Sequence, residues 1–320
     1  MGEVSVDVGH WSSDYNDNNG IKRSLNTLSS LFFRTNYMKL YDNKYYKLAN
    51  SIELFDGFVF KQNVAFSNRT ALTNNSQFSF FYTNKAYSTN LPVNNYVDTI
   101  NTGDYKALNA EFGFEYTPHM HYIYGANKRK MYAGSTYPTF SLNVKKGIPS
   151  VFDSKSDFLF VSGGISQRFK WGIASKFEYS ITAGGFPVNK NVHFADFYHV
   201  STQKIPVLIN TSYNSYFSLL DYYKASNNER FIESHVNLTL SYMALKFLPL
   251  LNLTNLRENV TLGLLSTPST KQYVELGYGL TNMPMGGSLS YVAGFDQKGF
   301  VLQGVKVTFN FTNTIVIGGE

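Results

Sequence analysis

Between residues 137 and 311, apolar and polar residues alternate in one segment after another, with no helical pattern between them. Residues 172–183 illustrate the pattern, because Phe177, Tyr179 and Ile181 share one parity while Lys, Glu, Ser and Thr recur on the other. Since successive side chains of a strand point to opposite faces, each segment predicts a strand with one apolar face and one charged, hydroxylated face.

The aromatic content separates two kinds of sheet that both alternate. Tyr, Phe and Trp make up 17% of the 320 residues, and Lys and Glu occupy the middle of several polar faces. A soluble β-sandwich also alternates, but this combination fits a transmembrane β-barrel, which has a lipid-facing apolar band, a wet interior and aromatic girdles. No window approaches the ~18–20 consecutive apolar residues of a transmembrane helix, which excludes a helical membrane protein. The net charge of +6 is dispersed, so no nucleic-acid partner is predicted.

The whole pattern predicts an all-β fold, a transmembrane antiparallel β-barrel of about twelve strands in a single domain, residues 1–320. A short helix is expected near 22–38, and the Asp56-Gly57 pair marks a tight hairpin. Long connections are expected at 10–42, 71–105 and 186–228, and medium-length ones at 118–136 and 244–255. The expected strands are 2–9, 43–55, 57–70, 106–117, 137–147, 157–169, 172–185, 229–243, 256–265, 271–280, 287–295 and 300–311.

Loop lengths and the N-terminal residues predict the cellular location of the protein and the orientation of its loops. If the last strand ends in the periplasm, most long loops fall outside the cell and the tight turns fall inside, as in bacterial outer-membrane barrels. Residues 1–8 already alternate as a strand, so the chain opens without the apolar run of a secretory signal. We therefore expect a bacterial outer-membrane protein, and expect this chain to be the C-terminal part of a longer one.

Six segments carry a resemblance to a known family: LFFRTNYMKLY (31–41), YPTFSLNVKKGI (137–148), FADFYHV (194–200), LLDYY (219–223), RFIESHV (230–236) and FLPLLNLTNLRE (247–258). They resemble a Bacteroidota outer-membrane β-barrel family that has no assigned function and usually follows a carboxypeptidase-regulatory-like domain. That family is distantly similar to the surface-antigen barrels of the assembly factors BamA and TamA.

The resemblance implies an architecture. BamA-like barrels have sixteen strands, and five of them follow a long sixth extracellular loop. Five strands follow residues 186–228 here, so the twelve strands would be the last twelve of sixteen. The Val-Arg-Gly-aromatic motif of that sixth loop is missing between 186 and 228.

Three functions are compatible with such a barrel. The first is help in assembling or exporting outer-membrane or surface proteins. Its partners would be outer-membrane lipid, unfolded outer-membrane or surface proteins and periplasmic accessory subunits. The alternative is a solute pore or partner-gated transporter. The third, a barrel-embedded hydrolase, is the least favoured, so we expect no enzyme, no cofactor and no catalytic residues.

The charges on the polar parity are the first candidate site. They carry both signs, so they either pair across the lumen or line a channel. Pairing is favoured over a channel lining. Pairs across the lumen, together with an inserted loop, would leave little open bore. These candidate residues are Glu53, Lys61, Glu111, Glu115, Lys145, Lys176, Glu178, Glu233, Arg257, Glu275 and Lys306.

Residues 186–228, called the long loop below, are the second candidate site. The loop is rich in aromatic residues and is expected to fold over or into the lumen as a gate or a plug, because long unpacked loops are uncommon. Its Asp196, His199 and Asp221 are expected to meet the charges of the strands. The candidate residues of this loop are Phe194, Asp196, Phe197, Tyr198, His199, Asp221 and Tyr222.

Three smaller patterns remain. His119 and His121 would face one way on a strand, but no third metal ligand lies nearby, so a solvated pair is favoured over a metal site. His193, Asp196, His199 and Ser201 include the residue types of a hydrolase relay, yet polar contacts that hold the loop explain them better. The last strand has a spacing similar to the signal of the barrel-assembly machinery, carried by Gly304, Val307, Phe309 and Phe311.

Overall fold

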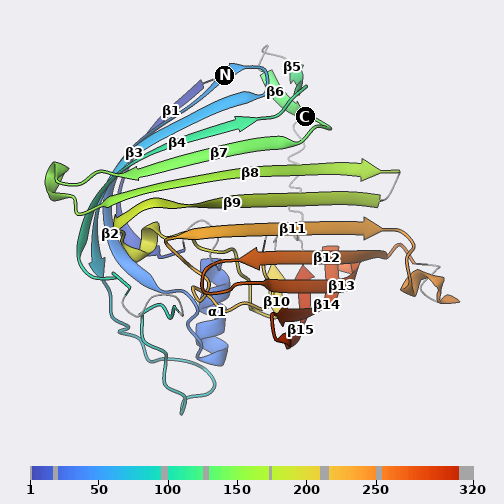
Figure 1. Ribbon diagram of the computed structural model, residues 1–320. Coiled ribbons are helices and arrows are strands. Elements are labelled where there is room, and N and C mark those ends of the chain that lie inside the picture. Colours follow the sequence, from blue (N-terminus) through green and yellow to red (C-terminus); the bar gives the residue numbers. More distant parts are fainter. Residues whose placement is uncertain are drawn as a thin grey trace, which may run out of the picture.

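The computed structural model describes residues 2–16, 21–94, 100–124, 130–172, 175–209, 216–249 and 254–309. Within these residues, thirteen strands form one strongly curved sheet (Figure 1). Twelve of them follow one another as antiparallel neighbours. These strands are β1 (Gly2–Asp14), β2 (Leu40–Phe55), β3 (Phe58–Ala71), β4 (Tyr105–Tyr116), β7 (Thr139–Gly147), β8 (Asp157–Trp171), β9 (Ser175–Asn191), β11 (Arg230–Leu240), β12 (Arg257–Ser266), β13 (Tyr273–Met283), β14 (Gly287–Asp296) and β15 (Gly299–Phe309).

The all-β prediction is confirmed, and each of the twelve expected strands corresponds to one of these strands. The expected helix near 22–38 is α1 (Arg23–Phe33), which ends where Arg34 takes a left-handed conformation. The hairpin at Asp56-Gly57 is also present, with Gly57 at φ +77°, where a Cβ would collide with the carbonyl oxygen of Thr117. Short 3-10 helices are η1 (Val151–Asp153), η2 (Phe194–Asp196), η3 (Leu245–Phe247) and η4 (Pro284–Gly286).

Two expected connections contain strands. The segment 118–136 includes a separate hairpin of β5 (His121–Tyr124) and β6 (Lys130–Gly134). The other is the long connection 186–228. Strand β9 continues into it as far as Asn191, because its last residues still pair with β8. Neither the β5–β6 hairpin nor the end of β9 shows a clear alternation of apolar and polar residues, which is why the sequence pattern did not predict them.

The burial of the sheet is the reverse of that of a soluble protein. Ile232 on β11 and Val305 on β15 are 55% and 54% exposed, and the other strands show similarly exposed apolar residues. On the opposite parity, Glu233, Glu275 and Lys306 are 7%, 5% and 3% exposed. We call these sides the apolar face and the polar face. The apolar side chains point outward, and these three charged side chains are covered.

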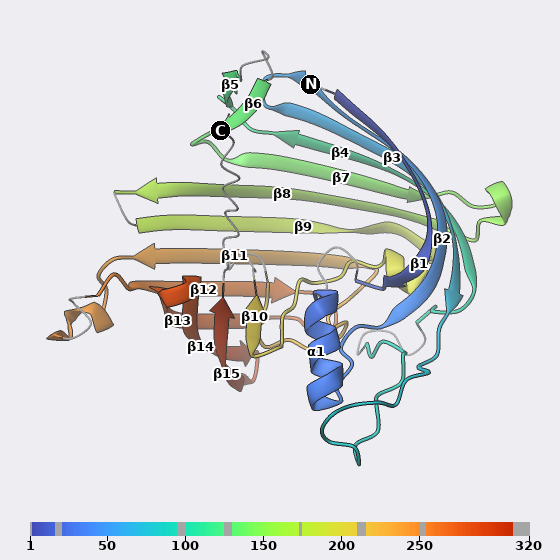
Figure 2. The ribbon, with the colours of Figure 1, turned by 180° about the vertical axis from the view of Figure 1, so that it is seen from behind.

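At the β15 end of the sheet, the long loop adds a short strand. Its short strand β10 (Val207–Ile209) pairs in parallel with Val307–Phe309, next to β15 in Figure 2. At the other end of the sheet stands β1, and within the described residues no ladder joins β1 to β15. No helix in the described part of the chain is both long and apolar enough to cross a membrane.

Candidate functional site

The long loop packs against the polar face at three places, and the first centres on Asp196. Its carboxylate accepts hydrogen bonds from Arg69 of β3 at 2.5 and 3.2 Å, from Lys145 of β7 at 2.7 Å and from Asn109 of β4 at 3.0 Å. Burial alone would raise the pKa of Asp196, but Arg69 and Lys145 hold that pKa well below its usual range. The carboxylate is therefore an ionised anchor between three strands.

Two buried histidines support this anchor. The His193 ring lies 3.2 Å from Arg69 Nη1, and its Nδ1 accepts a hydrogen bond from the Ala195 N–H. Burial, reinforced by Arg69, lowers the pKa of His193 to about 3. His199 contacts Ser226 Oγ at 2.8 Å and the Phe194 carbonyl oxygen at 2.9 Å, and burial lowers its pKa to about 4. Both rings are neutral at pH 7.

These contacts differ from those of a hydrolase relay. The carboxylate of Asp196 is bound to two cations, and His193 contacts Arg69 instead of a nucleophile. Ser201 supplies its carbonyl oxygen to the Phe217 N–H. Among the described atoms, these groups do not form a chain of nucleophile, base and acid.

The second anchor lies on β11. Tyr198 donates a hydrogen bond from its hydroxyl to Glu233 at 2.6 Å, and His235 Nε2 lies 2.7 Å from the same carboxylate. The Tyr198 ring also stacks on Phe231 of β11. Burial, together with Glu233, raises the pKa of the Tyr198 hydroxyl well above its usual value. Tyr198 is thus a neutral donor that satisfies a buried carboxylate.

The third anchor joins the loop to β13 and β15. Glu275 accepts hydrogen bonds from the backbone N–H groups of Ser218 at 2.6 Å and Leu219 at 2.9 Å. Lys306 Nζ donates to the carbonyl oxygens of Gln203 at 2.8 Å and Ile205 at 2.9 Å. Here the charged side chains of the strands bind backbone groups of the loop. The side chains of the loop therefore give no basis for predicting these contacts from the sequence.

Glycines of the polar face make room for the loop. A Cβ at Gly304 would lie 3.0 Å from Leu219 Cδ2, and one at Gly263 would lie 2.9 Å from the Phe217 ring. Gly304 therefore lies on the polar face, where the long loop packs against it. Val307 and Phe309 are on the opposite parity, and Phe311 lies outside the described residues.

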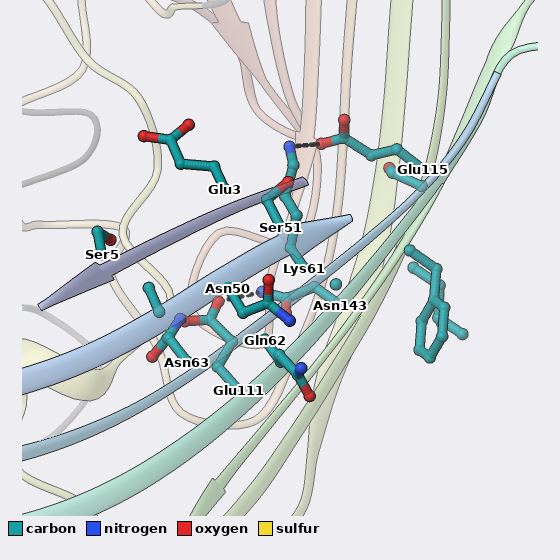
Figure 3. A pocket seen from close by; sticks show the side chains of 15 residues that line it. Glu3, Ser5, Asn50, Ser51, Lys61, Gln62, Asn63, Glu111, Glu115 and Asn143 are labelled. Carbon is teal, nitrogen blue, oxygen red and sulfur yellow. Dashed lines mark hydrogen bonds and ion pairs between the residues drawn. The ribbon is translucent and has the colours of Figure 1, made fainter. Parts of the chain in front are cut away.

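Other charges of the polar face pair among the strands, away from the loop. Lys61 contacts Glu115 at 2.6 Å, and Glu111 accepts from Asn63 and Asn143 at 2.9 and 2.8 Å. These residues line a cavity of about 450 Å³ beside β1 (Figure 3). Four predicted charges remain. Glu178 pairs with Arg168 and accepts a hydrogen bond from Asn237. Glu53 accepts hydrogen bonds from the Gly57 N–H and the Tyr122 hydroxyl. Lys176 is exposed and Arg257 is half-buried.

Part of the loop packs on itself. Asp221 pairs with Lys204 and Lys224, both in the loop. His199 contacts Ser226 and the Phe194 carbonyl oxygen, both in the loop. Asp196, in contrast, forms a hydrogen-bonded ion pair with strand residue Lys145. The aromatic candidates Phe194, Phe197 and Tyr222 are buried in one cluster with residues of α1, β2, β8 and β9.

Two sites were missed by the sequence analysis. Arg69 of β3 is not among the predicted site residues, although it binds Asp196. Glu258 lies on the apolar parity of β12 and is fully buried. It accepts hydrogen bonds from the backbone N–H groups of 243–245 at 2.8–3.1 Å, so the β11–β12 connection covers it. A lone carboxylate on an apolar parity is the signal that could have revealed it.

The histidine pair does not share a strand. His119 has φ +48° in the turn before β5, while His121 is the first residue of β5. The strand geometry that would turn both rings the same way is therefore not present. His119 packs on the Tyr137 ring, and the described residues contain no group of three metal-ligating side chains.

Residues 1–280 match the model of the C-terminal domain of a family of unknown function (DUF5686). The chain therefore belongs to this family. The match covers β1 to β12 and most of β13, which includes the long loop and its first two anchors. A search of the curated proteins found no match. The description of the family assigns no activity.

Proposed function

We propose that this chain forms the wall of an outer-membrane β-barrel that assists the assembly or export of outer-membrane or surface proteins. The observation that carries the proposal is the reversed burial of the sheet. Apolar side chains such as Ile232 and Val305 are half-exposed, while Glu233, Glu275 and Lys306 are covered. An apolar outer face and a polar inner face are what lipid requires of a barrel wall.

The long loop supports a filled interior. Its three anchors engage strands β3, β4, β7, β11, β13 and β15, which spread over most of the sheet. Buried charges remain stable only when they are paired and hydrogen-bonded. Displacing the loop would leave Arg69, Glu275 and Lys306 without these partners. A loop held in this way favours a plugged barrel over an open pore.

The edge at β15 supports a role in assembly. The loop strand β10 covers Val307–Phe309, while the rest of β15, residues 299–306, has only β14 as a strand neighbour among the described residues. Unpaired N–H and C=O groups on a sheet edge are a template for a further strand. A client protein that is folding into the membrane could add its strand there.

Site-specific cross-linking in the full-length protein tests this role. A photo-activated side chain at Val305, on the β15 edge, should capture outer-membrane or surface proteins during their synthesis. The matched control is Leu276, which is 48% exposed on the same apolar face but lies inside the sheet on β13. Capture of clients at Val305 and not at Leu276 supports the proposal. Equal capture at both positions, or capture at neither, refutes it.

The transport alternative has one favourable observation, the polar cavity of about 450 Å³ beside β1 (Figure 3). Conductance separates the two functions. Full-length protein in planar bilayers should conduct little with the loop in place and more after deletion of residues 190–225. High conductance that does not change on deletion would favour a pore and would contradict a plugging loop.

A further inference from the structure

A second cavity lies away from the anchors of the long loop. It measures about 670 Å³ and is formed by Arg34, the residue after α1, and by the segment 71–91 that follows β3. This size falls within the range of cavities that hold small organic ligands, about 300–1,000 Å³. A single inorganic ion would leave most of it empty.

The charged groups of this cavity are cations. Arg34 and Lys85 line it, and no Asp or Glu does. Lys85 Nζ is held by Thr35 Oγ1 at 2.7 Å, and Arg34 Nη1 donates to the Thr83 carbonyl oxygen. The cavity therefore offers the positive charge of Arg34 and Lys85 to a ligand.

A third cation stands behind the cavity wall. Lys39 Nζ donates to Ser88 Oγ at 2.8 Å and to the Thr89 carbonyl oxygen at 2.6 Å. Lys39 is itself buried, and Ser88 and Thr89 line the cavity. Two positive groups thus line the cavity and a third is bonded to its wall. This charge favours an anionic ligand such as a phosphate ester.

The rest of the lining is made of amides and hydroxyls. Asn74, Gln77 and Asn84 are exposed side chains on the cavity wall, and they can both donate to and accept from sugar hydroxyls. Beside the cavity, Phe78, Phe80, Phe81 and Tyr82 are 57–62% exposed. This aromatic shelf is fastened to α1, because the Phe80 N–H donates to the Leu31 carbonyl oxygen at 2.8 Å and the Phe32 and Phe80 rings pack at 5.6 Å.

We propose that this cavity binds a phosphorylated saccharide. The phosphate would contact Arg34 and Lys85, the sugar hydroxyls would bond to the amides, and an apolar part of the ligand would lie on the aromatic shelf. The same chemistry belongs to a free sugar phosphate and to the head of a phosphorylated glycolipid.

Binding to the full-length protein in detergent tests the proposal. Glucosamine 1-phosphate, measured by calorimetry, should bind more than tenfold more tightly than either glucosamine or inorganic phosphate. Vesicles of phosphatidylcholine with and without lipid A distinguish the sources. Tighter binding to lipid A vesicles than to the free sugar phosphate assigns the site to a glycolipid, and the reverse assigns it to a soluble ligand.

Variants locate the site. Lys85→Gln and Arg34→Gln should each weaken binding of the better ligand at least tenfold, while Lys44→Gln, an exposed lysine on β2, should not change it. Gln77→Ala should weaken binding of the sugar phosphate and leave that of inorganic phosphate unchanged. Equal affinity in Lys85→Gln and the parent protein, or inorganic phosphate bound as tightly as the sugar phosphate, would overturn the proposal.

Discussion

Lysine substitutions at neighbouring positions of β9 give the sharpest test of a membrane-embedded sheet. Ile181 is 43% exposed on the apolar face, near the middle of β9, and it lies opposite Ile165 and Ser234. Thr182 is the next residue and lies on the polar face, opposite Glu233 and Gly164. A shift of one residue along the strand therefore moves a side chain from the exposed apolar face to a site beside a carboxylate.

The expected magnitudes differ strongly. A Lys near the midplane of a barrel wall costs about 2–4 kcal/mol, so Ile181→Lys should lower the folded-to-unfolded ratio by about 1.5 to 3 orders of magnitude. Thr182→Lys should be nearly neutral, because its ammonium stays on the polar side near Glu233. In a soluble sheet the order would be reversed, since an exposed Ile tolerates Lys and a covered polar site does not.

Urea unfolding of the full-length protein in lipid vesicles measures both effects. The tryptophan fluorescence midpoint should fall clearly for Ile181→Lys and remain close to that of the parent protein for Thr182→Lys. Equal losses at the two positions, or a larger loss at Thr182, would refute the reversed burial as evidence for lipid contact. Repeating the pair in detergent checks that the effect depends on the apolar surroundings.

Three further outcomes concern the long loop. Asp196→Asn leaves the Arg69 guanidinium buried without its anion, which should cost about 3–5 kcal/mol and make the loop measurably more sensitive to protease. Gly304→Val should clash with Leu219 and lower the melting temperature through about 1–3 kcal/mol of overpacking, with partial recovery when Leu219→Ala is added. The folded pKa of His199, about 4, lies below its unfolded value of 6.5, so its contribution to stability should fall as pH drops below about 6.5, by about 2 kcal/mol at pH 5. His199→Gln should remove that share of the pH dependence in acid titrations followed by circular dichroism, while the share of His193, whose pKa is also lowered, should remain.

Strand positions and faces followed from local alternation, because every second side chain of a strand meets the same surroundings. That rule identified the strands and placed charges such as Glu233 and Lys306 on one parity. It could not find β10, since three residues of a loop are too short to show a period. It also missed the β5–β6 hairpin, whose Tyr, Lys and His residues do not alternate.

The contacts of the site depend on distances along the chain that no local pattern covers. Asp196 and Arg69 are 127 residues apart, and Glu275 is 56 residues from the Leu219 N–H that it binds. The alternation shows which charges need partners but not which partners they find. Backbone N–H and C=O groups are present at every residue, so the sequence does not mark which of them a buried charge will use.

The distribution of these contacts bears on whether the long loop is a gate or a plug. A gate that swings away must break its contacts at little cost. Here the loop is bound by Arg69 and Lys145 at one anchor and by Glu275 and Lys306 at another, all but Lys145 nearly fully buried. Each charge left behind in a covered site carries a penalty of several kcal/mol unless water or a client replaces the loop. If the sheet is the wall of the proposed barrel, these buried contacts therefore favour a plug over a gate.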